Sequence, residues 1–155
     1  MKFDSIVALL NASAALIQAA FVIVSVAYIN RQFGIVRACS YIERFNSHEN
    51  IRRRGTVDRW LESSDDDQTR ITVFLANSDL RADVLGFINL FQELGVAYRY
   101  HSVHRATVRE TFDFLVPYYW GQTRFLIEYR REERRSPTLY RKFQQLARVL
   151  AEKSE

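Results

Sequence analysis

An arginine and a histidine in the middle of the chain have residue types and a spacing that suit RNA cleavage. Arg99 precedes His104 with four residues between them. A histidine titrates near neutral pH and can move protons around a ribose 2′-hydroxyl, while an arginine stabilises charge that develops on phosphorus. On one straight helix the two side chains would point about 140° apart, so a break such as Ser102 must bring them together. A structural or interfacial Arg/His pair is the alternative.

A second polar group lies on the segment before this pair. Asn89 and Glu93 are four residues apart beside an apolar stripe, so both would lie on one helix face. Buried polar groups need partners, which Arg124 or another arginine would supply. We therefore predict a structural polar network of Asn89, Glu93 and Arg124. No metal site and no cofactor are predicted, because the three histidines and one cysteine lack a full set of ligand spacings and no phosphate-binding loop is present.

Three more polar residues recur in the N-terminal segment. Asn11, Gln18 and Ser25 are spaced by seven within residues 6–29, a stretch of 24 residues without a charged side chain. A helix of that length rises ~36 Å, enough to cross a hydrocarbon core of ~30 Å. Seven residues make almost two helical turns, so the three groups drift only ~20° per step around one face. The pattern predicts a membrane-spanning helix with a polar stripe.

The stripe has more than one interpretation. Polar groups in lipid are costly without partners, so it favours contact with copies of the same helix, or a water-filled pore. Alternatively, the membrane helix simply tolerates these three polar residues. A cleaved signal peptide is a further alternative, but its apolar region would be shorter and would follow a more basic start than Lys2 and Asp4.

Composition bounds the rest of the chain. About 120 of the 155 residues follow the N-terminal segment, enough for one small domain. Residues 30–54 carry six arginines and two glutamates, which favours a cytoplasmic location for this domain and an external N-terminus. The single cysteine, Cys39, allows no internal disulfide. The net charge of +4 would suit anionic lipid or nucleic acid, although much of it alternates with acidic residues.

Hydrophobic periodicity predicts an all-α fold. We expect an anchor in residues 1–35 and a helical domain in residues 36–155, with the first helix continuing to about residue 45. Further helices are expected over residues 48–61 and 68–76, from a cap at Ser78 or Asp79 to Tyr98, and over residues 107–134 with a kink at Pro117. Ser136 and Pro137 are predicted to open the last helix.

Three segments resemble a bacterial family known as domain of unknown function 4760. They are LGFINLFQELGVA at residues 85–97, FLVPYYWGQTR at 114–124 and SPTLYRKFQQLAR at 136–148. The resemblance implies a transmembrane helix followed by a cytoplasmic helical domain at the bacterial inner membrane. It specifies fold and anchoring better than chemistry.

The architecture is also similar to that of the small membrane accessory protein of type VI-B CRISPR systems, and the spacing of Arg99 and His104 resembles that of the HEPN ribonucleases. The first resemblance implies a ring-like pore in antiphage defence, and the second a metal-independent RNA-cleaving site shared by two subunits. A lipid bilayer, further copies of the chain and a defence-system protein would then be its partners, with RNA as the substrate of the alternative.

The preferred interpretation is a non-enzymatic, single-pass membrane protein that self-associates through its transmembrane helix and helical domain, with a pore-like or membrane-perturbing role in defence. One alternative is a membrane-tethered ribonuclease. The other is a scaffold that uses its helix only for location.

Overall fold

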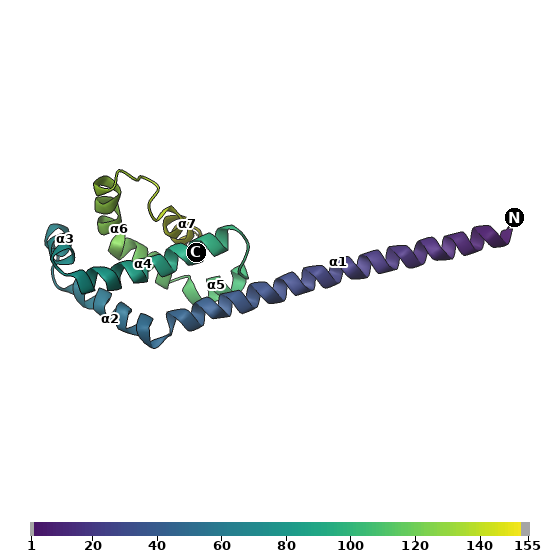
Figure 1. Cartoon of the computed structure of the whole chain (residues 1–155), viewed down its shortest axis with the longest axis horizontal. Coiled ribbons are helices and arrows are strands. Elements are labelled where there is room, and N and C mark those ends of the chain that lie inside the picture. The colour runs from purple at the N-terminus through teal and green to yellow at the C-terminus, as the bar shows by residue number, and fades with distance from the viewer. Residues whose placement is uncertain (1, 153–155) are drawn as a thin grey trace.

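The computed structural model describes residues 2–152, with side chains described for residues 13–152. All regular secondary structure in that part is helical, which confirms the predicted all-α fold. The elements are α1 (Lys2–Phe45), α2 (His48–Glu62), α3 (Asp67–Ala76), α4 (Ser78–Arg99), α5 (Arg105–Phe112), α6 (Leu115–Glu133) and α7 (Arg141–Ala151). Helices α2 to α7 gather into one body, from which the N-terminal part of α1 projects as a long rod (Figure 1).

Helix α1 continues without interruption to Phe45, as predicted. Its C-terminal third meets the body through Gly34, Ala38 and Phe45, which are buried and lie within one face. The chain then turns, and Ser47 caps α2 by accepting a hydrogen bond from the backbone N–H of Asn50. The predicted end of the first helix near residue 45 and the predicted restart at residue 48 are therefore confirmed.

Helix α4 is the central helix of the body. Its predicted apolar face is confirmed, because Val84, Phe87, Ile88, Phe91 and Leu94 are all buried. The face packs against rings from α1, α6 and α7, and a ring of α5 joins the cluster through Phe45. The ring contacts are Phe45 with Phe87 and Phe91, Phe91 with Phe143 at 5.1 Å, Phe87 with Tyr119 at 4.8 Å and Phe45 with Phe112 at 5.5 Å. Aromatic packing thus joins α1, α4, α5, α6 and α7 in one core.

Glycine allows α4 and α7 to approach closely. A Cβ at Gly95 would collide with the backbone carbonyl of Lys142 at the start of α7. Nearby, the side-chain carbonyl of Gln92 accepts a hydrogen bond of 3.0 Å from the backbone N–H of Phe143. Because that N–H lies in the first turn of α7, Gln92 caps α7 from the neighbouring helix.

The predicted cap of α4 was wrong by one residue. Asn77, rather than Ser78 or Asp79, holds the N-cap position with an extended backbone. Its Oδ1 accepts hydrogen bonds of 3.0 Å from the backbone N–H groups of Asp79 and Leu80. Asparagine is among the best N-cap residues because its side-chain oxygen reaches these otherwise unpaired donors.

The predicted helix over residues 107–134 is two helices in the structure. Helix α5 ends at Phe112, and α6 begins at Leu115. Pro117 explains the position of the break, because a proline ring clashes with the carbonyl four residues earlier, which here belongs to Asp113. Proline is tolerated in a first turn, so α6 starts just before it instead of kinking around it.

The start of the last helix was also predicted too early. Ser136 and Pro137 belong to a turn, in which Leu139 N–H donates to Ser136 at 3.1 Å, and α7 begins only at Arg141. Tyr140, directly before it, has a left-handed backbone with φ 57°. The apolar residues Phe143, Leu146 and Leu150 of α7 are buried in the core.

Candidate functional site

The projecting part of α1 has apolar side chains with no protein around them. Leu16, Ile17 and Phe21 are between 70 and 72% exposed, and the exposure continues to Phe33. In the described part of the chain, Ser13–Phe45 is the one helical stretch long and apolar enough to cross a membrane. A signal sequence would meet the same criterion of length and composition, so that alternative stays open.

The polar stripe lies on this part of α1. Gln18 is exposed and Ser25 half-buried, and a spacing of seven keeps them within one helix face. The side chain of Asn11 lies outside the described residues. Nothing in a single chain tests self-association through these groups, so the stripe stays a prediction.

The junction between α1 and the body is fastened at a glycine. The backbone N–H of His104 donates a hydrogen bond of 2.8 Å to the carbonyl of Gly34. A Cβ at Gly34 would lie 3.2 Å from this nitrogen and 3.5 Å from the carbonyl carbon of Val103. Glycine thus permits the backbone of the α4–α5 turn, residues 100–104, to rest directly on α1.

His104 has a structural role in this turn. It is the N-cap of α5, where its Nδ1 accepts from the backbone N–H of Thr107 at 3.4 Å and lies 3.0 Å from the hydroxyl of Thr107. A nitrogen that accepts a hydrogen bond carries no proton. Capping therefore occupies one ring nitrogen of His104 and leaves Nε2 for any proton transfer.

Arg99 faces different surroundings. It lies exposed in the last turn of α4 and lines an open cavity of about 440 Å³ between α4, α5 and α7, together with Arg105 and Arg148. His104 does not line this cavity. Within one chain, the structure therefore gives Arg99 and His104 separate surroundings, and their catalytic pairing stays a prediction that concerns two chains.

The turn carries further groups that sequence reasoning did not select. The guanidinium of Arg105 lies 4.9 Å from the ring of Tyr98 and 3.1 Å from Nε2 of His101. Tyr100 at the tip is 72% exposed, and the ammonium of Lys142 lies 6.0 Å from its ring. The alternation of aromatic and basic residues in residues 98–105 was the available signal.

The predicted network of Asn89, Glu93 and Arg124 is not formed in the structure. Asn89 is exposed, Glu93 pairs with Arg44 of α1, and Arg124 pairs with Glu128 on its own helix. Asn89 and Glu93 lie at the edge of the apolar face of α4, where neither needs a buried partner. The expectation of an arginine beside Glu93 was correct in type, but the arginine comes from α1.

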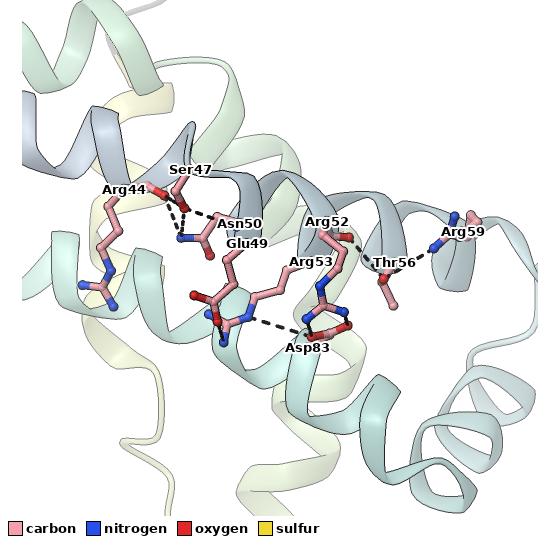
Figure 2. A network of polar contacts seen from close by, with 9 residues as sticks. All are labelled: Arg44, Ser47, Glu49, Asn50, Arg52, Arg53, Thr56, Arg59 and Asp83. Atoms are coloured by element: carbon pink, nitrogen blue, oxygen red, sulfur yellow. Dashed lines mark hydrogen bonds and ion pairs between the residues drawn. The ribbon is translucent and has the colours of Figure 1, made fainter.

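The polar network that does form joins α2 to α4, and Figure 2 shows it. The two terminal guanidinium nitrogens of Arg52 donate to the buried carboxylate of Asp83 at 2.8 Å, in a bidentate pair. Arg53 lies 3.9 Å from the same carboxylate and pairs with Glu49 one turn earlier. In the sequence, this arginine run indicates only the orientation of the membrane helix and carries no signal for the pairing with Asp83.

A second polar contact, which is partly buried, lies between α2 and α6. The hydroxyl of Tyr119 donates a hydrogen bond of 3.0 Å to Asp58. Burial, and then this hydrogen bond, raise the pKa of Tyr119 well above its ordinary value. The group therefore stays protonated and serves as a donor that ties the helices together.

Metal and thiol chemistry find no further support. Among the residues whose side chains are described, no three His, Cys, Asp or Glu residues lie together in a way that could hold a metal ion. Cys39 is exposed on α1. The site that remains is the junction of α1 with the α4–α5 turn, which presents a basic surface.

Comparison with known proteins supports the first resemblance. A family model described as Domain of unknown function (DUF4760) matches residues 9–149, so the match includes both α1 and the body. No significant match was found among curated proteins or among solved structures. The resemblances to the type VI-B CRISPR accessory protein and to HEPN ribonucleases stay predictions. The match over most of its length shows that the chain belongs to the DUF4760 family.

Proposed function

We propose that this chain is a single-pass membrane protein of the bacterial inner membrane, whose α1 anchors a cytoplasmic helical body and associates with copies of itself. The observation that carries the proposal is the exposure of α1. Every described side chain from Ser13 to Phe33 is exposed except the half-buried Ser25, although most of them are apolar. A bilayer removes such a surface from water without any contribution from the body.

The charge distribution supports the proposed orientation. Arg31 and Arg37 follow the apolar stretch directly, both exposed, while no acidic residue occurs between Asp4 and Glu43. Basic residues next to a membrane segment stay on the cytoplasmic side. The body, which begins to contact α1 at Gly34, would then lie against the inner leaflet.

Self-association through the polar stripe is the second part of the proposal. In the lipid core, amide and hydroxyl groups gain most by pairing across helices, and Ala15 and Ala19 allow close approach. A pore-like or membrane-perturbing role in bacterial defence, beside a defence-system partner, would follow if the stripe faces a shared lumen. If the stripe has no role, α1 serves a scaffold as an anchor alone.

The test is the mass of the full-length protein in detergent and in vesicles. Replacing Asn11, Gln18 and Ser25 together by leucine is expected to lower the oligomer mass and any ion leakage from vesicles. The matched control is Ala20→Leu with Ala27→Leu, because these positions lie about 200° from Gln18 and Ser25 on the helix. If both variants keep the wild-type mass and leakage, the scaffold interpretation replaces self-association through the stripe.

The ribonuclease alternative has its own test. Purified full-length protein would be incubated with RNA beside the Arg99→Ala and His104→Ala variants. The capping role of His104 gives the variants a second readout, because His104→Ala is expected to destabilise α5 by about 0.5–2 kcal/mol whatever the activity. RNA cleavage that both substitutions abolish, in variants that remain folded, would establish the ribonuclease in place of our proposal.

A further inference from the structure

We propose that the α4–α5 turn, together with Arg99 and Arg105 at its two ends, binds the anionic lipid headgroups of the membrane that α1 crosses. The surface consists of Arg99, Tyr100, His101 and Arg105 from the body and of Arg31 and Arg37 from α1. This inference rests on the proposed function, because it needs α1 in a bilayer. It adds a second, electrostatic contact between the body and the membrane.

The position of the turn along α1 gives its height above the membrane core. The hydrogen bond from His104 to Gly34 fixes the turn five residues after Ile29, the last residue of the uncharged stretch. At ~1.5 Å per residue this is a height of about 7.5 Å, and tilting α1 only lowers it. The polar layer of each leaflet is roughly 5–8 Å thick. The turn therefore lies at the level of the headgroups.

The arrangement of the body agrees with this height. In Figure 1 the α4–α5 turn meets α1 at the point where the projecting rod leaves the body. An open cavity there is lined by Asn30, Phe33, Gly34 and Arg37 from α1 and by His101 and Ser102 from the turn. The turn and the membrane-proximal residues of α1 thus form one continuous surface.

The charge of this surface is of one sign. No acidic residue occurs between Glu93 and Glu110. Arg99 and Arg105 are exposed, and the nearest acidic group in their cavity, Glu152, already pairs with Arg148 at 2.7 Å. Each arginine close to an anionic leaflet strengthens attraction by about fivefold. The arginines of this surface have too few carboxylates nearby to neutralise them. Lipid phosphates would supply the missing negative charge.

The tip of the turn has the side chain that an interface favours. Tyr100 is 72% exposed, and tyrosine is enriched where a membrane meets water because its ring is apolar and its hydroxyl is polar. The turn is also held in shape, because the N–H and the hydroxyl of Ser102 both donate to the carbonyl of Ala97, at 3.0 and 3.1 Å. The turn therefore loses little further conformational freedom when it contacts lipid.

The experiment uses the full chain in nanodiscs of phosphatidylcholine alone or mixed with phosphatidylglycerol. Amide hydrogen exchange over residues 98–107 is expected to be about fivefold or more slower in the anionic bilayer than in the neutral one. Arg99→Gln with Arg105→Gln should abolish the difference. The matched control, Arg59→Gln with Arg134→Gln, removes two exposed arginines elsewhere on the body and should retain it.

The same samples separate this inference from the proposed function. Slow exchange of residues 13–29 in both lipids reports that α1 is inserted. If these residues are protected while residues 98–107 exchange equally fast in both bilayers, the headgroup contact is overturned and the anchor stands. If residues 13–29 are unprotected in both, the proposed function itself fails. Slowing of the turn by added RNA in neutral nanodiscs, but not by phosphatidylglycerol, would overturn the lipid assignment in favour of nucleic acid.

Discussion

The projecting part of α1 and the core of the body use the same kinds of apolar side chain in opposite surroundings. Leu16 and Phe21 of α1 are each 72% exposed, whereas Leu94 and Phe91 of α4 are 1% and 0% exposed. Helix α4 is surrounded by other helices of the chain, whereas residues 13–33 of α1 have no such cover. The difference shows that apolar content alone does not define a core, and that α1 must find its apolar environment outside the chain.

The largest expected loss of stability comes from removing an aromatic ring from the core. Phe91→Ala should lower the free energy of unfolding by about 3–5 kcal/mol, because it leaves a cavity among four packed rings. Phe114→Ala is the control, since Phe114 is 71% exposed, and should cost under about 1 kcal/mol. Urea unfolding of the detergent-solubilised protein measures both. Equal losses would mean that Phe91 is not part of a tightly packed core.

The same substitution in the two regions tests α1 directly. Ile17→Arg should oppose membrane insertion by about 2.5–3.5 kcal/mol, because it places a charge at the centre of the apolar stretch. Ile51→Arg, at an exposed position of α2, should change stability by under about 0.5 kcal/mol. Extraction of membranes with alkaline carbonate measures the anchored fraction. If the Ile17→Arg variant is retained in the membrane as fully as the wild type, residue 17 does not lie in the lipid core.

The polar contacts of α4 sharpen the comparison within the body. Asp83→Ala should cost about 1–3 kcal/mol, because the bidentate bond to Arg52 is lost at a buried carboxylate. Glu93→Ala removes the exposed pair with Arg44 and should cost under about 1 kcal/mol. Thermal unfolding of the two variants provides the measurement. A larger loss for Glu93→Ala would show that docking of α1 onto α4 matters more to stability than the pair of Arg52 with Asp83.

The smallest effect is expected at Tyr119, and it depends on pH. Tyr119→Phe should cost about 0.5–1.5 kcal/mol at neutral pH by removing the hydrogen bond to Asp58. The raised pKa means that the folded state holds the phenolic proton more tightly than the unfolded state. Its contribution is therefore fully present below about pH 10, the ordinary value, and is lost as the pH rises further.

Unfolding measured at neutral pH and above about pH 10 checks this linkage. Tyr119→Phe should lose less stability over that rise than the wild type does. An identical pH dependence in both proteins would place the titration elsewhere.

Periodicity within single helices was the part of the fold that the sequence could predict. The end of α1 at Phe45, the start of α2 at His48 and the inner face of α4 all follow from local patterns. The break between α5 and α6 was predictable only in part, because Pro117 indicated a disturbance of the helix but not that one helix ends there. The late start of α7 was not predictable, because the turn that begins at Ser136 continues to the left-handed backbone of Tyr140. Long-range contacts such as Arg52 with Asp83 leave no spacing signal in one sequence.

The candidate site was predictable in composition but not in arrangement. The basic and aromatic residues near Arg99 were visible, and so was the polar stripe of α1. The capping role of His104 and its hydrogen bond to Gly34 were not, because they depend on two segments 70 residues apart meeting in space. The sequence therefore indicated possible chemistry at His104 and gave no signal that this residue also starts a helix.

The continuity of α1 has a mechanical consequence. One helix runs from Lys2 to Phe45 and is docked to the body from Gly34 onward, so no flexible linker separates the apolar stretch from the body. Each residue of an α-helix corresponds to a rotation of about 100° and a rise of about 1.5 Å. One residue inserted between the apolar stretch and Gly34 would therefore rotate the whole body by about 100° about the axis of α1. Seven inserted residues would move the body about 10 Å along this axis and almost restore its orientation.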